Sequence, residues 1–351
     1  MDNSTMTTLK EQWDALKTQN PNMRIRNAAA ELGVSEAELL VTKLGKEVTK
    51  LKPEFAAILT DAEQLGKVMA LTRNDDCVHE RKGVYLNPDF SSPHAGLLVG
   101  ADIDLRIFLM HWSTAFAVVE NTGRGIQKSL QFFGKDGLAI HKIYLTKDSN
   151  DAYFDELVSK YKAEDQSPAL EISAIKPKAE EKPDSEIDIP GFQEAWKNLK
   201  DTHDFFMLLR KFGVSRVQAL RLAPDTTFAK KIDNSSVVTM LEKAAESGLS
   251  IMAFTGNRGN IQIHTGPIKK TLWHGTWFNV MDPDFNLHLN TESIVESWVV
   301  RKPTEDGIVT AVEVFDKEGE IIVQFFGKRK PGIPELEEWR ALVNEIESIN
   351  I

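Results

Sequence analysis

The chain has 351 residues and is 42% hydrophobic, which supplies enough apolar material for about two domains with separate cores. Its formal net charge of −10 argues against binding to nucleic acid or to an anionic membrane, because both attract clustered positive charge. The single cysteine, Cys77, and an N-terminus without a signal-peptide pattern predict a cytoplasmic location, and the lack of a long apolar stretch predicts no membrane insertion.

The first elements that the sequence predicts clearly are two short helices in RNAAAELGVSEAELL, residues 26–40, with Gly33 in the turn between them. This spacing also occurs in helix-turn-helix DNA-binding proteins. Glu36 and Glu38 on the second helix would repel phosphates, so we interpret the segment as two packed helices.

Strands are predicted further along the chain. Residues 103–110 alternate, with Ile103, Leu105 and Ile107 on one side. Asp104, Arg106 and Phe108 lie on the other side. Glycine-containing turns at 121–125, 134–137, 305–307 and 317–319 predict hairpins and therefore antiparallel sheets. The segment TGRGIQKS, residues 122–129, lacks the P-loop spacing and is interpreted as one of these turns.

The second part of the chain repeats the first at a nearly constant offset. Leu105-Arg106-Ile107 matches Leu287-His288-Leu289 at an offset of 182, and MALTRN at 69–74 matches MAFTGN at 252–257 at an offset of 183. We predict an α+β fold with an internal duplication, in which each half has N-terminal helices and a large antiparallel β-sheet. The predicted boundaries are 1–162 for the N-terminal repeat, 163–190 for an acidic, proline-containing linker and 191–351 for the C-terminal repeat.

One histidine of the second half has two interpretations. The spacing of Phe192, Trp196, Leu199, His203, Phe206 and Arg210 predicts one face of a single helix. His203 can be an ordinary half-buried helix residue, or a ligand for haem iron beside a flat apolar surface. The equivalent residue in the first half is Asn20, so the packing of the repeat does not require an imidazole. Asp201 and Asp204 fall off this face, so a backbone carbonyl is expected to orient the ring.

Several longer stretches resemble one known family. They are HAGLLVGADIDLRIFLMHW at 94–112, DTHDFFMLLR at 201–210, IDNSS at 232–236, GNRGNIQIHTG at 256–266 and ESWVVRKPTEDG at 296–307. Together with the duplication and the linker, they make the chain similar to the bacterial HemS/HmuS-type haemin-utilisation proteins, also called haemin-degrading factors. The resemblance covers nearly the whole chain.

This resemblance implies one noncovalent b-type haem between the two halves, with His203 as the axial ligand on iron and Arg106 on the opposite face. Phe108 is expected to cover the ring from the same strand as Arg106. The other implied haem contacts are Arg216, Lys302, Gln324, Phe326, Arg329 and, as a second histidine, His79. Phe326 stands where some relatives have a tyrosine. The sequence alone also allows a salt bridge for Arg106 and a turn position for Lys302.

Two functions follow from the resemblance. In the first, the protein takes up imported haem and degrades it, with Arg106 and His203 as the catalytic pair, an external electron donor, ring opening and release of iron. In the second, it is a noncatalytic carrier that receives haem from an importer and delivers it to a separate haem oxygenase. A haem-independent structural module is a third interpretation, which predicts no Soret band on titration with hemin.

Overall fold

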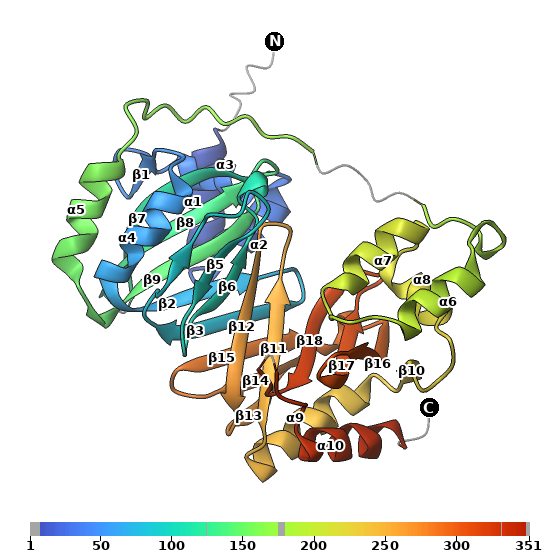
Figure 1. The fold of residues 1–351 in the computed structure, drawn as a ribbon. Coiled ribbons are helices and arrows are strands. Elements are labelled where there is room, and N and C mark those ends of the chain that lie inside the picture. The colour runs from blue at the N-terminus through green and yellow to red at the C-terminus, as the bar shows by residue number, and fades with distance from the viewer. Residues whose placement is uncertain (1–7, 124, 175–179, 331, 349–351) are drawn as a thin grey trace. The chain divides into compact units, whose positions relative to one another are not determined.

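The computed structural model describes residues 8–123, 125–174, 180–330 and 332–348. Contacts divide these residues into two compact units, and each unit is described by itself (Figure 1). Unit 1 takes its residues from 1–72, 82–176 and 257–260, and unit 2 takes its residues from 73–81, 177–256 and 261–351. In the described part of the chain, no helix combines the length and the apolar character needed to cross a bilayer.

Unit 1 is built around an antiparallel sheet with flanking helices. Its helices are α1 (Leu9–Gln19), α2 (Ile25–Leu32), α3 (Glu36–Val41), α4 (Phe55–Asp61), α5 (Asp151–Tyr161) and the 3-10 turns η1 (Ala62–Leu65) and η2 (Leu109–His111). The sheet order is β1 (Val48–Leu51), β7 (Trp112–Thr122), β8 (Gly125–Gly134), β9 (Ala139–Ser149) and β2 (Gly66–Arg73). A smaller meander contains β4 (Pro88–Asp89), β5 (Gly96–Val99) and β6 (Asp104–Ile107).

Unit 2 has the same plan. Its helices are α6 (Ile189–Lys197), α7 (Asp204–Phe212), α8 (Arg216–Arg221), α9 (Ser235–Ser247), α10 (Glu337–Glu347) and the 3-10 turns η3 (Asp184–Glu186) and η4 (Thr291–Ser293). One sheet runs β10 (Ala229–Ile232), β16 (Glu296–Thr304), β17 (Gly307–Phe315), β18 (Ile321–Gly327), β11 (Ser250–Gly256) and β12 (Asn260–Pro267). Another runs β3 (Cys77–Gly83), β15 (Phe285–Asn290), β14 (Trp277–Met281) and β13 (Thr271–His274).

Alternation along the strands of unit 2 gives its larger sheet two different faces. Val299, Val312 and Phe325 are buried in one core together with side chains of α9 and α10. Trp298 and Val300 point the other way and are buried together with side chains of α6, α7 and α8. The face beneath α6–α8 is the one that carries most of the candidate site.

The duplication is visible in local geometry. The helices α2 and α7 end at Gly33 and Gly213, both in the left-handed conformation, with φ of 67° and 64°. Two residues later, Ser35 and Ser215 each cap the next helix by accepting a hydrogen bond from a backbone N–H. The order β1-β7-β8-β9-β2 corresponds to β10-β16-β17-β18-β11. The predicted α+β class with internal duplication and antiparallel sheets is confirmed.

The repeat boundaries at 1–162 and 191–351 stay a prediction, since the contact units mix segments of both halves. Both described ends of the predicted linker make specific contacts. The Gln166 side chain exchanges hydrogen bonds with the backbone of Lys50, and the carbonyl of Lys182 accepts one from Gln218 at 2.7 Å. Residues 175–179 of the linker, and residues 1–7 of the N-terminus, lie outside the described residues.

Candidate functional site

The single helix predicted for residues 192–210 is wrong, because the segment forms two helices. The helix α6 ends at Lys197 and α7 begins at Asp204, with His203 immediately before its first residue. Asp201 causes part of this interruption, since its carboxylate accepts a hydrogen bond from the backbone N–H of His203 at 2.8 Å. As a result His203 leaves the apolar face, and 91% of its side chain is exposed.

The imidazole of His203 is held by a carboxylate and not by a backbone carbonyl. Its Nδ1 lies 2.6 Å from Oδ1 of Asp201, so the expectation that Asp201 plays no such role is also wrong. The reason is the chain break, because the turn before α7 folds residue 201 back onto residue 203. The pKa of Asp201 lies below its usual value, chiefly because of the hydrogen bond from the His203 backbone.

Two apolar side chains near His203 are exposed. Phe206 is 61% exposed and Met207 is 60% exposed, although their neighbours Phe205 and Leu208 are buried. Exposed large apolar side chains beside an exposed imidazole are typical of a surface that binds an apolar ligand. The start of α7 therefore presents a nitrogen donor and apolar area together.

Behind this surface lies a buried cluster of charges. The guanidinium of Arg216 donates two hydrogen bonds to the carboxylate of Glu313, at 2.6 and 2.7 Å, and the amino group of Lys302 donates a third at 3.0 Å. The two cations also lie 5.4 and 4.6 Å from the ring centre of Phe205. The cluster joins α7, α8, β16 and β17.

The cluster gives Arg216 and Lys302 a shared partner within the protein, Glu313, and their role as haem contacts stays a prediction. Glu313 is fully buried and neutralises one of the two positive charges, so the three residues together carry one net positive charge. Although burial opposes ionisation of Glu313, the two cations lower its pKa well below the usual value. Burial lowers the pKa of Lys302.

Gln324 and Phe326 lie on the same sheet face as this cluster. Gln324 pairs in register with Glu313, and Phe326 pairs with Ala311. Both side chains are half-buried, and the ring of Phe326 lies 4.9 Å from the ring of Phe254 on β11. The structure therefore brings together four of the predicted residues, namely Arg216, Lys302, Gln324 and Phe326.

Two predicted residues belong to unit 1. Arg106 lies on β6, where its guanidinium bonds the carboxylate of Asp104 and the carbonyl of Leu105, and 33% of its side chain is exposed. The strand ends at Ile107, and η2 begins at Leu109. The predicted alternation of buried and half-buried side chains is confirmed from Ile103 to Phe108, which is half-buried. The salt bridge that the sequence allowed for Arg106 is present.

Two further predicted residues have other surroundings. His79 on β3 is fully buried and packs edge-on against Phe285 at 5.0 Å, within the core of unit 2. Arg329 lies 3.7 Å from Asp306. It lines a cavity of about 670 Å³ together with residues of the α9–β11 turn and the start of α10.

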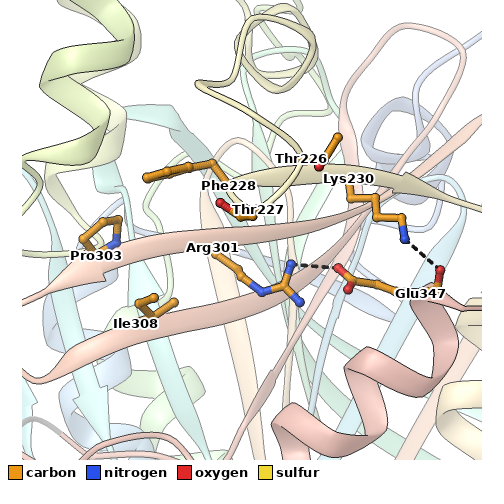
Figure 2. Close-up of a pocket in the computed structure, with 8 residues that line it drawn as sticks. All are labelled: Thr226, Thr227, Phe228, Lys230, Arg301, Pro303, Ile308 and Glu347. Atoms are coloured by element: carbon orange, nitrogen blue, oxygen red, sulfur yellow. Dashed lines mark hydrogen bonds and ion pairs between the residues drawn. The ribbon is translucent and has the colours of Figure 1, made fainter.

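Unit 2 has another cavity, of about 440 Å³. Figure 2 shows the residues that line it. Its charged residues already bind one another. Arg301 donates to the carboxylate of Glu347 at 2.7 Å, and Lys230 donates to the backbone carbonyl of Glu347 at 2.9 Å. These contacts fasten α10 to strands β16 and β10. Among the described residues, no group of three or more histidine, cysteine, aspartate or glutamate side chains is arranged to hold a metal ion.

Two residues of the site were not predicted from the sequence: Asp201 as the partner of the imidazole, and Glu313. A signal for Glu313 exists, because it is a lone acid inside the apolar strand IVTAVEVF, residues 308–315, where a charge needs a buried partner. A signal for Asp201 exists in its spacing of two residues from His203, which is that of an Asx turn.

These observations define a class of protein. Its members are duplicated α+β chains with an exposed histidine bound to a carboxylate and with a buried cationic cluster. The family described as "Haemin-degrading HemS.ChuX domain" matches residues 33–161 and again 213–346. The chain is 37% identical over 339 residues to hemin transport protein HmuS of Yersinia pestis, covering 95% of each. The chain belongs to this family.

Solved structures agree with this assignment. The structure of holo-PhuS, a heme-binding protein from Pseudomonas aeruginosa, matches with a TM-score of 0.94 and 47% identity, over 96% of this chain and 98% of that one. The structure of ChuS, an E. coli heme oxygenase, matches with a TM-score of 0.87 and 34% identity, over 97% and 99%.

Proposed function

We propose that this protein is a cytoplasmic haem-binding protein of iron acquisition, in which Nε2 of His203 binds the iron of one noncovalent b-type haem. The observation that carries this proposal is the geometry of His203, whose Nδ1 is bound to Asp201 while 91% of the side chain is exposed. An imidazole bound through one nitrogen to a carboxylate, with the other nitrogen open, is a common arrangement for metal ligands. The names of the relatives HmuS and PhuS support haem as the ligand.

The surroundings of His203 fit a haem group. Phe206 and Met207 supply exposed apolar area for the porphyrin, which is mostly hydrophobic. Arg216 is the cation of the cluster with exposed area, 21% of its side chain, so we propose it as the residue that meets a propionate. Lys302 is 5% exposed and, in this proposal, supports Arg216 through their shared partner Glu313.

We propose, as the finer function, that the protein degrades imported haem with electrons from an external donor. Bound haem supplies the iron that activates oxygen. Arg106 is proposed to take part in this chemistry; this role is supported by the resemblance and by the name of ChuS as a heme oxygenase. A noncatalytic carrier that delivers haem to a separate oxygenase is the second candidate, because the high exposure of His203 also favours exchange.

Titration with hemin tests the proposal. The wild type is expected to develop a Soret band at one equivalent, and His203→Ala is expected to shift that band and to bind hemin at least tenfold more weakly. His94→Ala is the matched control, because His94 is another exposed histidine. A spectrum of His203→Ala identical to the wild type would show that His203 is not the ligand.

Addition of reductant to the loaded protein separates the two candidates. Ascorbate or NADH is added with catalase present, since peroxide formed in solution can bleach haem without the protein. Degradation predicts loss of the Soret band with the appearance of tetrapyrrole absorption. A spectrum that stays intact supports the carrier.

A further inference from the structure

We infer that Asp201 is a positioning residue that fixes the tautomer of His203 and raises the electron density at its iron-binding nitrogen. This inference rests on the proposed function of His203. It concerns a residue outside the set implied by the resemblance.

The geometry at Asp201 is specific because one oxygen atom accepts two hydrogen bonds from the same residue. Oδ1 of Asp201 lies 2.8 Å from the backbone nitrogen of His203 and 2.6 Å from its ring Nδ1. The first contact fixes the backbone before α7, and the second fixes the rotation of the imidazole. Together they set the direction in which Nε2 points.

The charge of Asp201 decides which ring nitrogen carries the proton. An aspartate side chain is a carboxylate at neutral pH, so Oδ1 of Asp201 can only accept the hydrogen bond at Nδ1 of His203. Nδ1 must therefore be the donor. In the neutral imidazole this leaves the lone pair on Nε2, which is the form that binds a metal.

A neighbouring aspartate provides a natural comparison. Asp204 is the first residue of α7 and follows His203 directly. The imidazole of His203 is nevertheless hydrogen-bonded to Asp201. Both acids lie within two residues of the imidazole and differ in this contact. General electrostatic effects of a nearby negative charge would act through either residue, whereas positioning acts through Asp201.

The carboxylate also changes the properties of the bound iron. A negative partner on Nδ1 increases the donor strength of Nε2, which stabilises ferric haem relative to ferrous haem. Removing the negative charge while keeping the shape should raise the reduction potential. Asp201→Asn makes this change, because its amide oxygen can still accept both hydrogen bonds. Asp201→Ala removes the contacts as well.

The first test uses the ligand-free full chain. Long-range proton–nitrogen NMR on protein with labelled histidine reports the tautomer, and the His203 signal is assigned from its loss in His203→Ala. We expect the Nδ1–H tautomer in the wild type and in Asp204→Asn, and a mixture of tautomers in Asp201→Ala. The same mixture in the wild type would overturn the inference.

The second test uses hemin with the same variants. Asp201→Asn is expected to bind ferric haem tenfold to a hundredfold more weakly and to shift the reduction potential to a more positive value, while Asp204→Asn matches the wild type. A wild-type affinity and potential in Asp201→Asn would overturn the inference. If His203→Ala loses the wild-type spectrum in that case, the proposed function stands and only the inference fails. If wild-type protein binds no hemin, both fail.

Discussion

Phe205 and Glu313 organise the residues behind the candidate ligand. Phe205 is buried with its ring centre 5.4 and 4.6 Å from the two cations, and the fully buried Glu313 accepts hydrogen bonds from both. Their roles differ, since the ring provides packing and the carboxylate provides charge. A buried pair of like charges is tolerated here because Glu313 accepts hydrogen bonds from both.

Replacing this carboxylate should destabilise the protein. In Glu313→Gln two buried cations lose their counter-charge, so we expect the free energy of unfolding to fall by about 3 kcal/mol. Urea unfolding at pH 7 measures the change. Glu318→Gln is the control, because Glu318 is an exposed acid that pairs with exposed Lys317, and it should change stability by less than about 0.5 kcal/mol. Equal stability of both variants would contradict the prediction.

At the scale of elements, the break between α6 and α7 determines the site. The side chains of Trp196 and Phe205 still pack together, with ring centres 4.7 Å apart, so the two helices share one core. The turn between them frees His203 from that core. Its neighbours Phe205 and Phe206 consequently have opposite environments, 1% and 61% exposed.

These adjacent phenylalanines allow a matched pair of substitutions. Phe205→Ala empties a buried position and should lower the free energy of unfolding by about 3 kcal/mol or more. Phe206→Ala should change it by less than about 0.5 kcal/mol, because its ring is exposed. Under the proposed function, hemin titration should show weaker binding for Phe206→Ala. Urea unfolding measures the stabilities, and the assignment of faces fails if the two variants lose equal stability.

At the scale of the whole molecule, the two repeats share a framework but differ in charge. Glu36 occupies the position equivalent to Arg216, each as the first residue of a helix that follows a capping serine. Glu36 is buried and binds Lys142, whereas Arg216 binds Glu313. The cationic cluster belongs to the second repeat, which also carries His203.

Buried histidines in both units predict loss of stability in acid. Burial lowers the pKa of His141 in unit 1 and of His264 in unit 2 to about 3. The unfolded chain binds these protons below about pH 6.5, whereas the folded chain does not until about pH 3. Stability should therefore fall as the pH drops through this window, by about 2 kcal/mol per histidine between pH 7 and pH 5.

Urea unfolding at the two pH values measures this loss. A transition midpoint that does not move between pH 7 and pH 5 would contradict the neutral, buried state of the two histidines.

The sequence by itself determined the α+β class, the duplication, the antiparallel hairpins and the family, because these depend on periodicity and on short motifs that are local in the chain. It also selected His203. The tertiary structure decided what surrounds each candidate residue. Arg216 is hydrogen-bonded to Glu313, which lies 97 residues further along the chain, and His79 is buried against Phe285. Spacing predicts which residues share a face, but it does not predict where a polar turn ends a helix or which distant charge pairs with a buried one.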